Sequence, residues 1–347
     1  MFEDMAKNLS SWLSGKGDEN MVVLSSRVRL ARNVAGCVFP SAADAETREK
    51  VIGYFESALA RSKKLSQGRL IKASELTDLD KSFLVERHLM SPTFMQGSNS
   101  GALYVSEDEK VSIMVNEEDH FRIQALAPGL DPETPFKAAG EYDNEIGGLL
   151  EFDYDPDFGF LTACPTNVGT GLRASVLIHL PGLVITKEID RVITKITQMG
   201  VAVRGFYGEG TDVLGNLFQV SNQNTLGISE EETLKLIKNV TQKIIEEEAS
   251  ARERLIDEAS DQISDKIWRA YGILKYARVL TSEEVMNLLS AVRLGVAMKI
   301  INNIDISLIN QLLLLSQPAH LQKYYSEEMT PDKRDVVRAE MVRDRLK

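Results

Sequence analysis

Apolar and polar positions alternate with two different periods in the first two thirds of the chain. Strand-like patterns predict strands at 21–30, 111–115, 177–180 and 217–220, and a helical period predicts helices at 46–64 and 188–199. These segments follow one another without a regular βαβ order. The pattern therefore predicts an α+β fold with a largely antiparallel sheet.

After Gly227 the helical period dominates to the end of the chain. Apolar residues recur at spacings of three and four through 263–277, and helix starts are predicted at four capping residues: Ser229, Thr281, Asp305 and Thr330. The expected organisation is a short helical segment at 1–20, a mixed domain at 21–250 and a helical domain at 255–347. The boundary is expected inside a highly charged helix near 246–258.

Composition narrows the class of protein. The chain has 347 residues, and 43% hydrophobic and 26% charged residues are ordinary for a globular enzyme. No apolar run is long enough to span a bilayer, and the acidic start lacks the pattern of a signal peptide. Only Cys37 and Cys164 are present, so a reducing cytoplasm is expected. A net charge of −11 argues against a nucleic-acid partner.

Arginines and carboxylates gather in a few short segments beside strand ends and turns. These segments are 25–29, 116–122, 164–176, 204–210 and 219–222. Strand alternation places Arg27 and Arg29 on one face of the first of them. There is no GxxxxGK[ST] motif, so a P-loop is excluded.

A cluster of guanidinium groups can hold a triphosphate through paired, charge-assisted hydrogen bonds. Phosphoryl transfer needs mainly positioning and positive charge, and such a cluster with Mg²⁺ supplies both. Glu118 and Glu209 are then expected to face a cationic acceptor. Taken singly, each segment also fits a solvated surface, and Cys164 fits either a small buried side chain or a nucleophile without its usual flanking signature. No metal-ligand spacing involves His120 or the other histidines.

Four strings together resemble the phosphagen (ATP:guanido) kinase family, in the family's order over residues 21–225. They are SSRVRLARN, NEEDHFR, CPTNVGTGLRASV and RGFYGEG. The resemblance implies a guanidino-kinase and glutamine-synthetase-like antiparallel sheet flanked by helices, followed here by the helical domain. It also implies ATP and Mg²⁺ as cofactors.

The resemblance further implies a role for individual residues. Glu118 and Glu209 are expected to hold the acceptor guanidinium, with the catalytic base left open between them, and Cys164 is expected beside it. No protein ligand of the metal is expected. The expected nucleotide-binding residues are Ser25, Ser26, Arg27, Val28, Arg29, His88, Arg122, Arg173, Ala174, Ser175, Val176, Arg204, Gly205, Phe206, Tyr207 and Gly208.

The ends of the chain depart from the small-molecule members of that family. Only about twenty residues precede the first motif, where those kinases carry a helical domain that encloses the free substrate. A helical C-terminal region is present instead, which looks like the bacterial protein-arginine kinases of the McsB type. Its RDxxRA string is expected to form an allosteric phosphoarginine pocket from Arg334, Asp335, Arg338 and Ala339.

That resemblance implies a cytoplasmic kinase for proteins with exposed arginines, which marks them for Clp-protease degradation in stress. It also implies two kinds of partner, an McsA-type activator and a Clp chaperone or protease. A homodimer is expected, and binding to nucleic acid or to a membrane is not. Two other functions stay open. One is a small-molecule guanidino kinase, and the other is a phosphoarginine reader or protease adaptor with little catalysis of its own.

Overall fold

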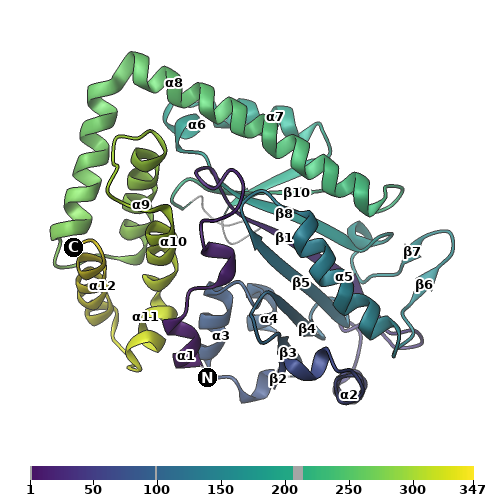
Figure 1. The fold of residues 1–347 in the computed structure, drawn as a ribbon. Coiled ribbons are helices and arrows are strands. Elements are labelled where there is room, and N and C mark those ends of the chain that lie inside the picture. Colours follow the sequence, from purple (N-terminus) through teal and green to yellow (C-terminus); the bar gives the residue numbers. More distant parts are fainter. Residues whose placement is uncertain (1, 98–99, 206–213) are drawn as a thin grey trace.

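The computed structural model describes residues 2–97, 100–205 and 214–347 (Figure 1). Within these ranges an eight-stranded sheet has the order β2-β3-β4-β5-β1-β8-β10-β9, and each pair of neighbours is antiparallel. The prediction of an α+β fold built on an antiparallel sheet is confirmed. Figure 1 shows the sheet at the centre with helices on both sides.

The strands of this sheet are β1 (Val23–Arg32), β2 (Arg69–Lys72), β3 (Ala102–Val105), β4 (Val111–Val115), β5 (Phe121–Pro128), β8 (Leu172–His179), β9 (Val201–Gly205) and β10 (Leu217–Asn222). A separate small hairpin pairs β6 (Tyr154–Asp155) with β7 (Gly159–Phe160). The predicted strand at 111–115 is confirmed. The strand predicted at 21–30 lies two residues later along the chain, and the one predicted at 217–220 extends two residues further than predicted. The strand predicted at 177–180 covers only the end of the longer strand β8. Polar side chains in the first half of β8 interrupt the apolar run on which the prediction was based.

One face of the sheet is covered by an apolar core. Alternate strand residues such as Val28, Ile123 and Val176 point into it. The covering helices are α2 (Ala45–Arg61), α5 (Glu133–Gly147), α6 (Pro181–Ile185), α7 (Ile189–Thr197) and the first half of α8 (Glu230–Tyr276). In Figure 1 α5 and α8 cross in front of the strands. The helices predicted at 46–64 and 188–199 are confirmed with slightly shorter ends.

The opposite face is divided among two further cores with charged strand residues between them. At one side α1 (Phe2–Lys7), α3 (Asp78–Glu86), α4 (Pro92–Gln96) and α11 (Pro318–Tyr325) pack on β3 and β4. At the other, the second half of α8, α9 (Ser282–Ala297), α10 (Ile306–Leu315) and α12 (Pro331–Arg345) form a core with Trp12 and Leu13 of the 3₁₀ helix η1 (Ser11–Leu13). The remaining short 3₁₀ helices are η2 (Leu65–Gln67), η3 (Ala73–Glu75) and η4 (Pro165–Asn167).

The predicted helix starts are confirmed by their caps. The side chains of Ser229, Thr281, Asp305 and Thr330 accept hydrogen bonds from the first turns of α8, α9, α10 and α12. Helix α8 runs through 246–258 and has non-helical backbone at Ala259 (φ −145°, ψ 32°). Its residues up to Ala251 belong to the first core, and those from Leu255 belong to the core of the C-terminal helices. None of the described helices combines the length and apolarity needed to cross a membrane.

Candidate active site

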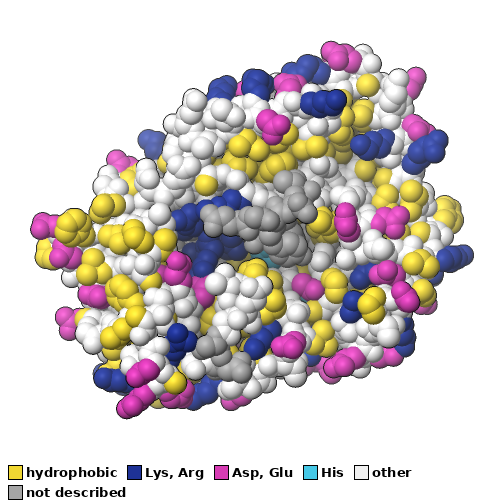
Figure 2. Space-filling model, turned by 180° about the vertical axis from the view of Figure 1, so that it is seen from behind, with side chains coloured by type: hydrophobic (Ala, Val, Ile, Leu, Met, Phe, Trp, Pro, Cys, Tyr) yellow, Lys and Arg dark blue, Asp and Glu magenta, His cyan; other side chains and the backbone are white. Residues whose placement is uncertain are grey.

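A cavity of about 1080 Å³ opens in the middle of the charged face of the sheet. Figure 2, seen from behind relative to Figure 1, shows Lys and Arg side chains gathered in this hollow. Its charged lining consists of Arg27, Arg29, Arg48, Arg122, Arg173, Arg204, Glu117, Glu118 and Asp119. His88 and Cys164 also line it. The structure therefore brings together eight of the residues that the sequence singled out.

Strand register explains why distant arginines meet. On β1, Arg29 lies opposite Gln124 of β5 on one side and Arg173 of β8 on the other. Arg204 of β9 lies opposite Gln219 of β10. Directly opposed residues project from the same face of a sheet, so these side chains share one surface. The predicted common face of Arg27 and Arg29 is confirmed and extends over five strands.

Two of these arginines have no carboxylate partner within the part of the chain that the structure describes. Arg27 and Arg29 form no ion pair with any described residue, and Nε of Arg29 is buried without a hydrogen-bond partner. Burial, aided by the charge of Arg122, lowers the pKa of Arg27 to about 10. The same causes, with Arg27 and Arg173 added, hold the pKa of Arg29 well below its usual value. Buried unpaired cations are unfavourable, and a polyanion in the cavity would relieve that.

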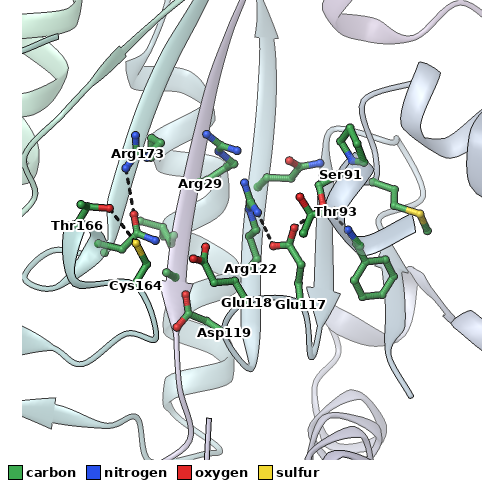
Figure 3. A pocket seen from close by; sticks show the side chains of 18 of the residues that line it. Arg29, Ser91, Thr93, Glu117, Glu118, Asp119, Arg122, Cys164, Thr166 and Arg173 are labelled. Carbon is green, nitrogen blue, oxygen red and sulfur yellow. Dashed lines mark hydrogen bonds and ion pairs between the residues drawn. The ribbon is translucent and has the colours of Figure 1, made fainter. Parts of the chain in front are cut away.

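Arg122 is held differently, by a buried carboxylate. It forms an ion pair with Glu117, which also accepts a hydrogen bond from the hydroxyl of Ser91. Burial alone would lower the pKa of Arg122, but Glu117 outweighs it and the pKa is raised. Sequence reasoning missed Glu117, and its place next to Glu118 in the strand-ending turn was the one available signal. Figure 3 shows this pair between the arginine group and Thr93.

Arg173 is oriented by neutral groups. Its guanidinium donates to Oδ1 of Asn167 at 3.2 Å and to the carbonyl of Asn222 at 3.4 Å. The Asn222 side chain in turn accepts from the backbone N–H of Ala174 at 2.9 Å. Burial, followed by the charges of Arg204 and Arg122, lowers the pKa of Arg173. The segment 219–222 thus contributes to the site by fixing an arginine.

Glu118 projects into the cavity from the turn between β4 and β5. Asn116 begins this turn in the left-handed region (φ 61°) and donates its N–H to the carbonyl of His120 at 2.9 Å. Burial, followed by the charge of Asp119, raises the pKa of Glu118. In Figure 3 Glu118 lies between Cys164 and Arg122. A carboxylate with a raised pKa beside a cation cluster is suited to accept a proton.

A buried carboxylate joins this turn to the loop that carries Cys164. Oδ1 of Asp119 accepts from Nδ2 of Asn33 and from the backbone N–H of Ala163, both at 2.7 Å. The Sγ atom of Cys164 lies 3.0 Å from Oγ1 of Thr166, and the thiol is free. Two of the three predicted acceptor-side residues, Glu118 and Cys164, therefore lie on loops that hydrogen bonds join.

The two histidines of this region have different surroundings. His88 follows α3 in the left-handed region (φ 61°), and its ring lies 4.8 Å from that of Trp12. Burial, with the charge of Arg27, lowers the pKa of His88 to about 3, so its ring is neutral. His120 instead accepts from the backbone N–H of Val34 at 3.1 Å and contacts the carbonyl of Val38 at 3.0 Å. It is a structural residue.

Several residues expected to bind nucleotide do not line the cavity. Val28, Ala174 and Val176 point into the core on the opposite face, because they alternate with the arginines along their strands. Ser25, Ser26, Ser175 and Gly205 are buried and do not line the cavity. Contact of these residues with a nucleotide stays a prediction. Glu209, Phe206, Tyr207 and Gly208 lie outside the described residues.

Several lining residues were not foreseen from the sequence. They are Arg48, Ser91, Thr93 and Gln124. Asn116, Glu117 and Thr166 also line the cavity, inside segments that the sequence singled out but without a role assigned to them. Ser91 caps α4, and Arg48 comes from α2, so both reach the cavity from helices that carry no recognisable motif. Their contribution depends on how the helices pack on the sheet.

The predicted phosphoarginine segment lies at α12, away from this cavity. Arg338 is buried and donates to the carbonyls of Ser316 and Leu280, both at 2.7 Å, and to the carboxylate of Asp335. Ala339 is buried in the core of the C-terminal helices. Arg334 is more open and donates to the carbonyl of Met329 at 3.5 Å. A phosphoarginine pocket at this place stays a prediction.

The side chains that line the cavity suit a metal ion that is bound mainly by the ligand in the cavity. The described residues include no group of three or more His, Cys, Asp or Glu side chains placed to hold a metal ion. Glu117 and Asp119 are engaged with Arg122 and with backbone or amide donors. A Mg²⁺ ion would therefore depend on phosphate oxygens for most of its ligands, which is its common mode of binding.

Comparisons with known proteins agree with this geometry. The description "ATP:guanido phosphotransferase, C-terminal catalytic domain" matches residues 50–251, and "Protein-arginine kinase McsB C-terminal domain" matches residues 260–347. A protein-arginine kinase of Geobacillus sp. (strain WCH70) is 47% identical, over 98% of this chain and 94% of its own length. One from Desulforamulus reducens is 44% identical, over 99% and 97%.

Solved structures give the same family at greater distance. Lombricine kinase aligns with a TM-score of 0.59 and 27% identity, over 71% of this chain and 70% of its own. The duplicated taurocyamine kinase from Schistosoma mansoni, with bound transition-state analogue components, aligns with a TM-score of 0.60 and 27% identity, over 66% and 33%. The chain belongs to the ATP:guanido phosphotransferase family, in its protein-arginine kinase branch.

Proposed function

We propose that this protein transfers the γ-phosphate of ATP to arginine side chains of other proteins. The observation that carries the proposal is that Arg27 and Arg29, half-buried and without an ion pair among the described residues, line a cavity that also holds Glu118. Such a cavity has an excess of positive charge for a triphosphate and a carboxylate for a cationic acceptor. Nearly full-length similarity to protein-arginine kinases supports the protein acceptor.

The arginines would bind the phosphates and stabilise charge in the transition state. Arg29 is central, between Arg173 and Gln124, and Arg122 is held in one orientation by Glu117. Fixed cations need no rearrangement as negative charge develops, which is how electrostatic preorganisation lowers a barrier. When bound, Mg²⁺ would neutralise phosphate charge and help to align the reacting groups.

Glu118 would orient the acceptor guanidinium and take its proton. A terminal nitrogen of the acceptor arginine forms the N–P bond, the bond from phosphorus to the ADP oxygen breaks, and the nitrogen's proton passes to Glu118. An arginine side chain is a poor nucleophile because its pKa is above about 12. The raised pKa of Glu118 makes that proton transfer less unfavourable. Glu209, outside the described residues, is proposed as the second carboxylate at the guanidinium.

The decisive experiment measures acid-labile phosphate on casein after incubation with Mg-ATP. We expect Glu118→Gln to lower the rate by about 10²–10⁴-fold, the usual contribution of a general base, with little change in ATP affinity. Glu328→Gln, an exposed carboxylate in the loop between α11 and α12, serves as the control. Undiminished phosphorylation by the Glu118 variant would show that another group is the base.

The same assay separates the alternatives. Turnover on free arginine without protein phosphorylation would favour a small-molecule guanidino kinase, the type to which the solved relatives belong by name. A reader or adaptor would keep its cellular role in the Glu118 variant and lose it when Arg338 is replaced.

Free phosphoarginine added to the assay tests the proposed pocket of Arg334, Asp335, Arg338 and Ala339. An allosteric site predicts a change in initial rate.

The cellular setting is proposed on the family resemblance. It comprises a cytoplasmic enzyme with an McsA-type activator, a Clp chaperone or protease that receives the marked proteins, and a homodimer. Two free cysteines suit a reducing compartment. Exposed apolar residues on α8 and α12, Trp268, Tyr276 and Val336, suit a dimer contact. Light scattering of the purified chain tests the dimer, and co-purification tests the activator.

A further inference from the structure

The small hairpin of β6 and β7 carries two exposed aromatic side chains. Tyr154 is 57% exposed and Phe158 is 55% exposed. In Figure 1 the hairpin projects from the edge of the molecule, beyond the strands of the main sheet. Exposed apolar side chains that gather in one place commonly mark an interaction site.

The turn of the hairpin has a shape that its own sequence specifies. Oδ1 of Asp155 accepts from the backbone N–H groups of Asp157 and Phe158, at 2.8 and 3.0 Å. This arrangement is the one in which an aspartate side chain replaces a backbone acceptor in a turn. Gly159 follows in the left-handed region (φ 77°), where glycine has no steric penalty. Phe158 is therefore presented by a preformed turn.

The base of the hairpin is packed on the sheet. The ring of Tyr154 lies 5.2 Å from the ring of Phe160, its partner across the two strands. The guanidinium of Arg32 lies 3.5 Å from the centre of the Phe160 ring and is itself paired with Asp143. A surface that is ordered in advance loses less conformational entropy when it binds a partner.

A third exposed apolar residue adjoins the hairpin. The N–H of Phe160 donates to the carbonyl of Gly169 at 2.8 Å, and a Cβ atom at Gly159 would lie 2.5 Å from the same carbonyl oxygen. A Cβ atom at Gly169 would in turn lie 2.8 Å from Cα of Leu226, which is 52% exposed. Three segments of the chain thus meet at Gly169. We name the apolar surface that they carry the rim patch, which consists of Tyr154, Phe158 and Leu226.

The rim patch is continuous with the part of the cavity that holds Glu118 and Cys164. Four residues separate Phe160 from Cys164, a span of at most about 14 Å. Nδ2 of Asn33 donates to the carbonyl of Leu161 in this connection, at 3.0 Å, and to the carboxylate of the residue that follows Glu118. The hairpin is therefore joined to both loops that carry the acceptor-side residues.

Figure 3 places this part of the cavity at one end of the arginine group. Cys164 and Thr166 lie on one side of Arg29 and Arg122, and Ser91 lies on the other side. A molecule that extends from Glu118 past Cys164 leaves the arginines behind it. The rim patch thus adjoins the end of the cavity where the acceptor guanidinium is proposed to lie.

The charge around the rim patch distinguishes a polypeptide from a nucleotide. Glu151 and Asp157 are exposed carboxylates next to the aromatic pair, and Asp155 is partly exposed between them. In Figure 2 the edge of the molecule that carries the hairpin shows hydrophobic and acidic side chains on the same face as the basic hollow. Carboxylates repel a triphosphate and attract a segment that contains arginine.

We propose that the rim patch binds the polypeptide that carries the acceptor arginine, through an apolar side chain of that polypeptide. The proposal rests on the proposed kinase function and names its substrate class. From Phe158 to Cys164 the chain spans at most about 20 Å, which an extended substrate covers with about six residues. The preferred acceptors are therefore extended segments in which an apolar residue lies about that far from an arginine.

Phe158→Ser tests the proposal with little risk to the fold, because the Phe158 side chain is exposed. We expect KM for casein to rise by about tenfold, a usual cost of truncating an interface aromatic, while KM for ATP stays unchanged. Tyr325→Ser, at an exposed aromatic that ends α11, is the matched control and should keep the wild-type KM for casein.

Two results would overturn the inference. The first is an unchanged KM for casein in Phe158→Ser, or a rise that KM for ATP shares. The second is a shift from dimer to monomer in light scattering with KM for casein unaltered, which would assign the rim patch to a second copy of the chain.

Two synthetic peptides test the substrate class. Each is a glycine–serine sequence with one arginine, and one of them also carries a leucine about six residues to either side of that arginine. We expect kcat/KM of the wild type to be about tenfold higher for the leucine peptide, and Phe158→Ser to abolish the difference. Equal values for both peptides in the wild type would contradict the proposal.

Photo-cross-linking gives a readout that does not depend on activity. With p-benzoylphenylalanine in place of Phe158, irradiation without ATP should link the protein to casein, and with the same group in place of Tyr325 it should not. Absence of cross-linking at position 158 would refute the rim patch as a polypeptide-binding surface. A wild type that fails to phosphorylate casein, while position 158 cross-links to it, would refute the proposed function and leave this surface standing.

Discussion

At the scale of single residues, arginines at two positions of strand β1 have opposite roles. Arg32 pairs with Asp143 at 2.9 Å, donates to the carbonyls of Ala31 and Thr170, and lies over the ring of Phe160. Arg29, three residues earlier, is half-buried, and its Nε atom is buried without a hydrogen-bond partner. The first arrangement stabilises the fold, whereas the second stores unfavourable free energy that a bound anion can release.

This contrast predicts opposite effects of two equivalent substitutions. We expect Arg29→Met to leave the free energy of unfolding unchanged or higher and to weaken ATP binding by at least about tenfold, because a desolvated cation is removed. Arg32→Met should lower stability by about 3–5 kcal/mol, since Asp143 loses its partner. Urea unfolding and nucleotide titration measure both. A large loss of stability in Arg29→Met would contradict this account of the cavity.

At the scale of elements, the turn that ends α3 links the C-terminal helices to the arginine-lined cavity. The carboxylate of Glu86 accepts from the N–H groups of Ala319 and His320, at 2.8 and 2.7 Å, and so occupies the start of α11. Arg87 is fully buried between Glu109 (2.5 Å) and the ring of His320 (3.4 Å). His88 then faces the cavity. Three consecutive residues thus span from α11 to the active site.

Glu86 gives this junction a pH dependence. Burial raises the pKa of Glu86 to about 7, although the two N–H groups act in the opposite direction. The folded state then binds more protons than the unfolded state between the unfolded value of 4.5 and about 7, so this group's contribution to stability falls as pH rises through that window. We expect Glu86→Gln to flatten the change in unfolding free energy between about pH 5 and 7.5.

Urea unfolding at several pH values measures this effect. Glu328→Gln, exposed after α11, should keep the wild-type dependence on pH. An unchanged slope in the Glu86 variant would place the titrating group elsewhere.

At the scale of the whole molecule, the sheet and the C-terminal helices share one core. Four strands each contribute a leucine to the core of α9–α12, namely Leu24, Leu126, Leu177 and Leu217. Residues of α1 and α11 pack together against α3 on the other side. Helix α8 contributes residues to both main cores. Separating the sheet from the C-terminal helices would therefore expose apolar surface.

A chain that ends at residue 251 should therefore fail to fold as a stable monomer. Removing the C-terminal helices exposes the four strand leucines, which favours aggregation or a loosely packed state. Size-exclusion chromatography and near-ultraviolet circular dichroism measure the outcome against the full chain. A monomeric fragment with a cooperative unfolding transition would show that the catalytic region is an independent domain.

The sequence by itself determined the fold class, the helix caps and the common face of Arg27 and Arg29. These features depend on local periodicity and on side chains within a few residues of one another, which is the range over which such patterns are reliable. The family strings likewise located Arg122, Arg173 and Arg204, whose place in the cavity the structure bears out.

Only the tertiary structure decided which charges are paired. Glu117 holds Arg122, Asp119 joins the Glu118 turn to the Cys164 loop, and Asn287 reaches the turn before β10 from a helix seventy-two residues further along the chain. Likewise, Val28 and Val176 lie within the family's strings yet point away from the cavity, because strand alternation turns every second residue to the other face. Such partners are brought together by the packing of segments far apart in the sequence, so a local sequence pattern does not predict their contacts.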